Sequence, residues 1–169
     1  MNIYNQDKIK LVNSVFTKVH KNYDLMNDLM SLGIHRLWKR NLIDWMKPQP
    51  GNKIIDVAAG TGDLAKMISI KNDNNNIFCC VEPNKEMLGI GKEKLKSFVN
   101  IKWYLSSAEK LPFEENTFDF YTISYGIRNV TDINQCLREA YRVLKPGGRF
   151  FCLEFSTVEN EILNLLYQK

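Results

Sequence analysis

Apolar residues recur along this chain with two alternating periods. Short, mostly apolar runs predict five buried strands, at 53–57, 77–82, 101–105, 118–124 and 149–155. Helical spacing predicts five helices, at 8–20, 36–46, about 62–70, 85–98 and 133–144. Because strands alternate with helices after residue 50, we predict an α/β fold with a parallel sheet and helices on both faces.

Caps and apolar faces can be assigned to several of these helices. Asn84 is expected to cap the helix that follows it, and Thr131 or Asp132 the last helix. The motif KPGG (145–148) should end that last helix in a turn. Its inner face is predicted to hold Ile133, Leu137, Ala140 and Leu144. In the helix at 36–46 we expect core packing, with a lipid-facing or substrate-tail surface as the alternative, for Trp38, Leu42 and Trp45.

Composition narrows the class of protein. The chain has 169 residues, of which 44% are hydrophobic and 25% charged, as in an ordinary globular domain. The net charge of +4 permits contact with anionic lipid, but no basic block argues for nucleic acid. The apolar runs are too short for a membrane span, and no signal peptide is visible. The four cysteines lie among apolar residues without a CxxC pair, so we expect reduced core thiols and no metal site.

The stretch IIDVAAGTGD (54–63) carries the strongest chemical signal. A strand here runs into a glycine-rich turn that opens a helix, which is how α/β proteins bring a ligand close to the backbone. Ligands of such sheets bind beyond the carboxyl ends of the strands. Four segments are therefore candidates for the site: 56–62, 82–84, 106–109 and 124–129.

Two cofactors compete for this turn. Residues 60–65 match the dinucleotide pattern GxGxxA, and Glu82 lies about 20 residues beyond Gly62, where a ribose-binding acid is expected. However, Asp56 and Asp63 flank the turn, and no Lys or Arg lies between Lys53 and Lys66 to offset them. Their charge disfavours a pyrophosphate and suits the ammonium and sulfonium of S-adenosylmethionine. An NAD-dependent oxidoreductase remains the alternative function. The alternative without any ligand is that these residues form only a tight turn.

Five stretches of the chain are distinctive: KNYDLMNDLMSLGIHRLWKR (21–40), DVAAGTGDLA (56–65), SAEKLPFEENTFD (107–119), ISYGIRNVTD (123–132) and YRVLKPGGRFFCLEFS (141–156). They resemble the ubiquinone/menaquinone biosynthesis C-methyltransferases, class I S-adenosylmethionine-dependent enzymes that act on prenylated quinol precursors. The resemblance implies a Rossmann-like fold whose last strands are missing from this chain, which ends at Lys169. It also implies an N-terminal helical segment over the substrate (1–50) and a cofactor-binding domain (51–169).

The cofactor contacts are predicted partly from the residues alone and partly from the family resemblance. The residues alone place Asp56, Gly60 and Gly62 around the turn. The resemblance adds Thr61 in the turn, Glu82 on the ribose hydroxyls, Ser107 and Ala108 beside the adenine, and Ser124 at the end of the fourth strand. Two positions depart from the family pattern: Ala59 replaces a frequent glycine, and Glu82 with Pro83 replaces a pair led by Asp.

The resemblance implies methyl transfer to a quinol ring carbon. The protein must align the reactants and make the ring electron-rich by removing or sharing a phenolic proton. Arg128 and Asn129 are the candidates, with Tyr23 reaching over the site. Arg128 is too basic to be an ordinary base, so we assign it to phenolate stabilisation or to ordering a water, with a structural ion pair as the alternative. For Tyr23 the alternative is a packed aromatic side chain.

Partners and location are constrained more weakly. The substrate is expected to be a polyprenylated benzoquinol, with a naphthoquinol as the close second. A non-catalytic S-adenosylmethionine-binding subunit is a further alternative. Peripheral contact with a membrane, a homodimer and a quinone-biosynthesis complex are open. The resemblance implies either the matrix side of the mitochondrial inner membrane or the bacterial cytoplasm.

Overall fold

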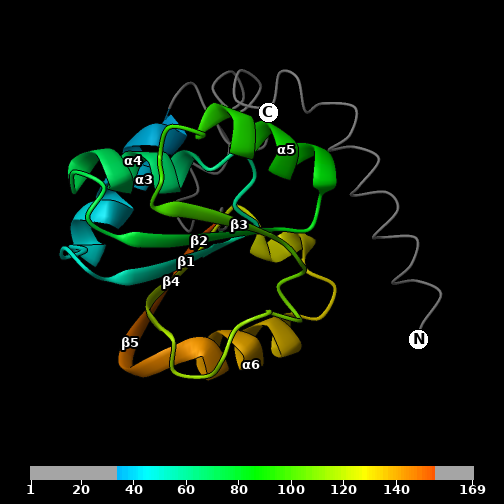
Figure 1. Cartoon of the computed structure of the whole chain (residues 1–169). Coiled ribbons are helices and arrows are strands. Elements are labelled where there is room, and N and C mark those ends of the chain that lie inside the picture. The colour runs from blue at the N-terminus through cyan, green and yellow to red at the C-terminus, as the bar shows by residue number, and fades with distance from the viewer. Residues whose placement is uncertain (1–33, 155–169) are drawn as a thin grey trace, which may run out of the picture.

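Strands and helices alternate along the chain, as the sequence predicts (Figure 1). The computed structural model describes residues 34–154. The elements in chain order are α3 (Ile34–Met46), β1 (Lys53–Val57), α4 (Asp63–Lys71), β2 (Ile77–Glu82), α5 (Lys85–Lys94), β3 (Ile101–Leu105), β4 (Phe118–Ser124), the short 3₁₀ helix η2 (Ile127–Asn129), α6 (Ile133–Val143) and β5 (Leu144–Leu153). The helix predicted at 8–20 lies outside the described residues, and the division of the chain at residue 50 stays a prediction.

The described strands form one parallel sheet in the order β3-β2-β1-β4-β5. Chain order runs outward in one direction from β1 to β3 and then returns to the other side of β1 with β4. The order therefore reverses between β1 and β4, and ligands of open parallel sheets bind at such a reversal. The predicted α/β class and the parallel sheet are confirmed.

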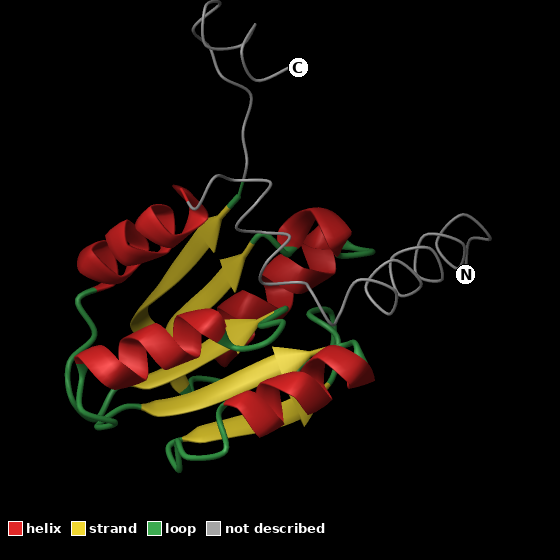
Figure 2. Ribbon diagram, turned by 90° about the horizontal axis from the view of Figure 1, so that it is seen from above, coloured by secondary structure: helices red, strands yellow, loops and turns green. Residues whose placement is uncertain are grey.

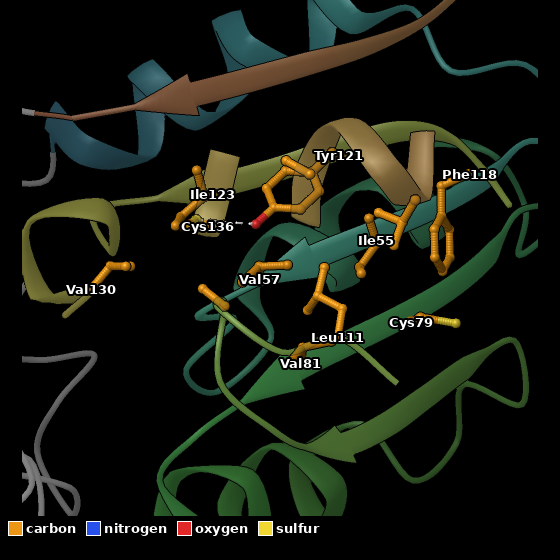
Figure 3. Packing of buried hydrophobic residues seen from close by; sticks show 13 residues of the cluster. Ile55, Val57, Cys79, Val81, Leu111, Phe118, Tyr121, Ile123, Val130 and Cys136 are labelled. Atoms are coloured by element: carbon orange, nitrogen blue, oxygen red, sulfur yellow. Dashed lines mark hydrogen bonds between the residues drawn. The ribbon is translucent and has the colours of Figure 1, made fainter. Parts of the chain in front are cut away.

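Helices cover each face of the sheet. Neighbouring residues along each strand point to opposite sides, so the strands supply apolar side chains to both faces. Ile54 and Phe120 face a cluster built with α3 and α4. Ile55 and Tyr121 face a second cluster built with α6. Figure 3 shows this second cluster, in which the Tyr121 hydroxyl lies 3.6 Å from Cys136 Sγ. Seen from above, helices lie over both sides of the strands (Figure 2).

Element boundaries agree with the sequence for the first four strands, differ by one or two residues at three helices, and differ most at two places. Helix α5 ends at Lys94, four residues earlier than predicted. Strand β5 begins at Leu144, directly after α6, and it includes the KPGG segment that we expected to be a separate turn. A register shift against β4 absorbs these extra residues, since Phe118 pairs with Leu144 but Phe120 pairs with Arg149. The caps at Asn84 and Asp132 are confirmed by bonds from Met87 and Gln135 amides, of 3.0 and 2.9 Å.

Several side chains lie on the face opposite to the one predicted. On α6, Ala140 is buried as predicted, but it lies on the inner face with Cys136 and Val143, whereas Ile133 and Leu137 are exposed. The helix carries apolar residues on both faces, and the face with the smaller residues lies against the sheet. Trp45 is 76% exposed rather than in the core, while Leu42 is buried as expected. Cys152 is exposed, and the other three cysteines are buried.

Candidate functional site at the carboxyl ends of the strands

The loops that follow β1 and β4 meet at the reversal of strand order. Ala58, directly after β1, and Tyr125, directly after β4, both have positive φ angles, of 54° and 56°. Gly126 lies against Ala58 so closely that an added Cβ would be 2.6 Å from the Cβ of Ala58. Left-handed backbone at non-glycine residues is uncommon and costs free energy, and it clusters at functional sites. The loop geometry therefore supports a site here.

Glu82, at the end of β2, reaches back to the glycine turn. Its Oε2 accepts a hydrogen bond from the Gly60 amide, and its Oε1 accepts one from the Asn84 amide, both at 2.9 Å. Burial raises the pKa of Glu82, and these two hydrogen bonds partly offset that effect. The predicted neighbours Glu82 and Gly60 are thus brought together. Each carboxylate oxygen has a second lone pair with which it can accept a ribose hydroxyl.

Asp56 lies deeper than Glu82, inside the sheet. Its Oδ1 accepts a hydrogen bond of 2.8 Å from the Thr122 hydroxyl on the neighbouring strand β4. Burial raises the pKa of Asp56 from 3.8 to about 7, against the opposing effects of the Thr122 hydrogen bond and Lys39. Asp56 is therefore not a fixed negative charge near neutral pH.

The second acid of the turn, Asp63, is paired with two lysines. Lys94 Nζ lies 2.7 Å from Asp63 Oδ1, and Lys39 Nζ lies 3.5 Å from Asp63 Oδ2. Burial acts to raise the pKa of Asp63, but the two lysines outweigh burial and hold that pKa below its ordinary value. Our argument that no cation offsets the acids of the turn is therefore wrong. The offsetting cations come from α3 and α5, far from the turn in sequence.

Gly62, the last residue of the turn, packs against the protein itself. Its φ angle is +82°, and an added Cβ would lie 2.7 Å from Leu95 Cδ1 and 3.0 Å from the Trp103 ring. The backbone conformation and the α5–β3 packing both require glycine here. The structure thus gives Gly62 a packing role in addition to the predicted one in cofactor binding, which stays a prediction. Thr61, its neighbour, is buried and accepts a hydrogen bond of 3.3 Å from Lys94.

The remaining predicted cofactor residues lie at the ends of β3 and β4. Ala108 is buried in the cluster on the α6 side, and Ser107 is half-buried beside it. Within the described part of the chain, the buried Oγ of Ser124 has no hydrogen-bond partner. An unpaired buried hydroxyl is costly, so Ser124 suits a polar ligand group. With the acids at Asp56 and Glu82, these residues fit a nucleoside cofactor.

Arg128 and Asn129 lie in η2, after β4. The Arg128 guanidinium forms an ion pair with Glu154, just beyond β5. The alternative role that we gave Arg128, a structural ion pair, is therefore present. Half of the Arg128 side chain stays exposed, and the ion pair fixes the guanidinium beside the ends of β4 and β5. Tyr23, the third predicted catalytic residue, lies outside the described residues.

Sequence reasoning missed four residues that shape the site: Lys39, Lys94, Thr122 and Glu154. Each acts on a residue of the turn or of the loop after β4 from a distant part of the chain. Lys39 and Glu154 lie in stretches that carry the family resemblance, but no local motif marks any of the four as a site residue. Between residues 34 and 154, no helix is both long and apolar enough to cross a membrane. The same residues contain no group of three His, Cys, Asp or Glu side chains that could hold a metal ion.

Comparison with known proteins gives matches along nearly the whole chain. A sequence model of the ubiE/COQ5 methyltransferase family matches residues 2–169. The chain is 49% identical over 168 residues to the ubiquinone/menaquinone biosynthesis C-methyltransferase UbiE of Brucella abortus (strain S19), covering 96% of this chain and 62% of that protein. It is 51% identical over 164 residues to the protein of the same name from Rickettsia prowazekii (strain Madrid E), covering 94% and 66%.

The chain therefore spans less than two thirds of the length of these relatives. Among solved structures, a SAM-dependent methyltransferase from Aquifex aeolicus aligns with a TM-score of 0.66 at 20% identity, covering 73% of this chain and 66% of that one. This likeness shows that the sheet and its helices form the Rossmann-like fold of such methyltransferases.

Proposed function

Because the chain belongs to the ubiE/COQ5 methyltransferase family, we propose that it transfers a methyl group from S-adenosylmethionine to a ring carbon of a polyprenylated quinol. The observation that supports this most strongly is the family match over residues 2–169, together with acids at the ends of β1 and β2 beside the glycine turn. The names of the relatives support a benzoquinol or a naphthoquinol as the substrate. Family membership, and not the charge of the turn, argues against the NAD-dependent alternative.

The cofactor supplies a methyl group that its sulfonium already activates. The residues of this chain that would hold it are Glu82 for the ribose hydroxyls, Ser107 and Ala108 beside the adenine, Asp56 near the cationic end, and Ser124 as a hydroxyl donor. The Gly60 amide is fixed by Glu82, so the turn and the ribose-binding acid are positioned together. This arrangement supports binding without rearrangement of the turn.

Arg128 is proposed to stabilise the phenolate that the quinol forms as it loses a proton. Its ion pair with Glu154 holds the guanidinium in one orientation, and half of the side chain is exposed at the ends of β4 and β5, where a phenolate could approach the cation. Asn129, next in η2, adds an amide at the same loop. A preorganised cation that meets charge as it develops accelerates such a step.

A methyl-transfer assay tests this function. Labelled S-adenosylmethionine is incubated with the protein and a short-chain prenylated quinol, and label in the quinol is measured. We expect transfer by the wild type, and turnover on the order of 10²-fold lower in Arg128→Ala with cofactor affinity kept. Arg138→Ala, which removes an exposed arginine on α6, is the matched control and should retain turnover.

Failure of the assay has a distinct meaning. If the wild type binds S-adenosylhomocysteine but transfers no label to any benzoquinol or naphthoquinol, the non-catalytic subunit replaces the enzyme. Normal turnover in Arg128→Ala would return Arg128 to a purely structural role. The bacterial relatives support a bacterial location. The mitochondrial location, membrane contact, homodimer and larger complex stay predictions.

A further inference from the structure

The glycine turn lies beside two ammonium groups. Lys94 is bound to both neighbouring acceptors, at 2.7 Å from Asp63 and 3.3 Å from the Thr61 hydroxyl. Lys39 makes a longer contact, 3.5 Å from Asp63 Oδ2, although its side chain is only 12% exposed. Lys94 therefore satisfies Asp63 more closely than Lys39 does. Within residues 34–154, Lys39 makes only this long contact, so its ammonium can donate to a further acceptor.

The two lysines of this cluster are not paired equally well. Both contact Asp63, Lys94 at 2.7 Å and Lys39 at 3.5 Å, while Asp56, on which Lys39 also acts, lies deeper and is bound to Thr122. A nearly buried ammonium is costly unless it is well paired. Both ammonium groups lie beside Asp63, the first residue of α4. An anionic group of a ligand would complete the pairing of Lys39.

Helix α3 holds Lys39 in this position. Leu42, Ile43 and Met46 of α3 are buried against the sheet. The end of the helix is fixed by Arg149, which donates a hydrogen bond of 2.5 Å to the Met46 carbonyl. Asp44 is further tied to Lys71 of α4 at 2.5 Å. Lys39 is therefore presented to the turn by a rigid element, as a binding residue should be.

The proposed cofactor has one group that matches this cation. Its methionine end carries a carboxylate beside its ammonium, and its adenosine end is assigned to Glu82. We propose that Lys39 binds the carboxylate of the methionine end of S-adenosylmethionine, across the glycine turn from Glu82. This inference rests on the proposed function and adds the anion-binding half of the site. The acids at Asp56 and Glu82 account only for the cationic and ribose groups.

Two ligands that differ in the amino-acid group test this inference. S-adenosylhomocysteine carries the carboxylate, and 5′-methylthioadenosine lacks the whole amino-acid end. Calorimetry measures both affinities in the wild type, in Lys39→Met and in Lys39→Arg. Lys39→Met should weaken S-adenosylhomocysteine about tenfold or more, because a charge-assisted hydrogen bond is lost, and should leave 5′-methylthioadenosine within about twofold. Lys39→Arg should restore most of the affinity for S-adenosylhomocysteine.

The controls separate folding from binding and this inference from the proposed function. Methionine keeps the apolar stem of Lys39, and Lys92→Met removes an exposed lysine of α5 as the matched control, with no change expected for either ligand. Equal losses for both ligands, or no loss for either, would overturn the role of Lys39. If the wild type fails to bind S-adenosylhomocysteine at all, the proposed function falls, and the inference falls with it.

Discussion

At the scale of single residues, the two buried acids of the site differ in their surroundings. Glu82 accepts hydrogen bonds from two backbone amides, which fix the positions of both carboxylate oxygens beside the turn. Asp56 accepts one hydrogen bond, from the Thr122 hydroxyl, within the sheet. Each environment sets how the acid behaves: Glu82 is held as an acceptor, whereas the proton of Asp56 depends on pH near neutrality.

Asp56 makes stability fall as pH rises. Its pKa is about 7 in the folded protein, against 3.8 as the ordinary value, so the folded state binds more protons than the unfolded state between about pH 4 and pH 7. The free energy of unfolding should therefore decrease across that window, by about 4 kcal/mol at most. Asp56→Asn should remove this dependence and unfold at a higher temperature than the wild type at pH 8. Thermal melts from pH 5 to pH 8 measure it, and parallel curves for the two proteins would contradict the assignment.

Sequence reasoning at this scale found the pairs that a motif spaces and missed the pairs that the fold creates. The spacing of about 20 residues between Gly62 and Glu82 predicted that this acid would lie at the turn, and Glu82 binds the Gly60 amide. Lys39 and Lys94 lie 24 and 31 residues from Asp63 in sequence. No local pattern signals that they pair with it, because only the tertiary fold brings α3 and α5 to the turn.

At the scale of elements, α5 lies on β3 through a glycine. An added Cβ at Gly91 would be 2.2 Å from the Trp103 ring, whereas nothing lies within 4 Å of one at Gly89. Gly91 faces the sheet and Gly89 faces solvent on the same helix. The contact at Gly91 sets how closely α5 approaches β3, and the same Trp103 ring lies against Gly62 of the turn.

The two glycines of α5 provide a matched pair of substitutions. Gly91→Ala should destabilise the fold by about 1–3 kcal/mol, because the methyl group overlaps Trp103 and the helix must shift. Gly89→Ala should stabilise it by about 0.5–1 kcal/mol, since alanine loses less backbone entropy in a helix. Urea denaturation of both variants measures the difference. Equal midpoints would show that Trp103 does not limit the approach of α5.

The sequence predicted element positions better than element faces. The first four strands were located correctly because each is a short, mostly apolar run, a signal that does not depend on distant contacts. The inner face of α6 was predicted correctly at Ala140 and wrongly at Ile133 and Leu137, because the helix carries apolar residues on more than one side. Periodicity alone cannot choose between Ile133 with Leu137 and the smaller Cys136, since packing against the sheet decides it.

At the scale of the whole molecule, sheet order determines where the site lies. The order β3-β2-β1-β4-β5 places the ends of β1 and β4 side by side and brings the end of β2 next to them. The predicted contacts of the cofactor come from these ends and from the loop after β3. The predicted substrate residues lie after β4, and Tyr23 lies in the N-terminal part beyond the described residues. One edge of the sheet thus carries both halves of the proposed reaction.

The central claim is that the carboxyl ends of these strands bind S-adenosylmethionine. Isothermal titration of the full chain with S-adenosylhomocysteine and, separately, with NADH tests it most directly, because both share adenosine and only NADH carries a pyrophosphate. We predict saturable binding of S-adenosylhomocysteine and no measurable binding of NADH. Saturable binding of NADH without binding of S-adenosylhomocysteine would contradict the claim.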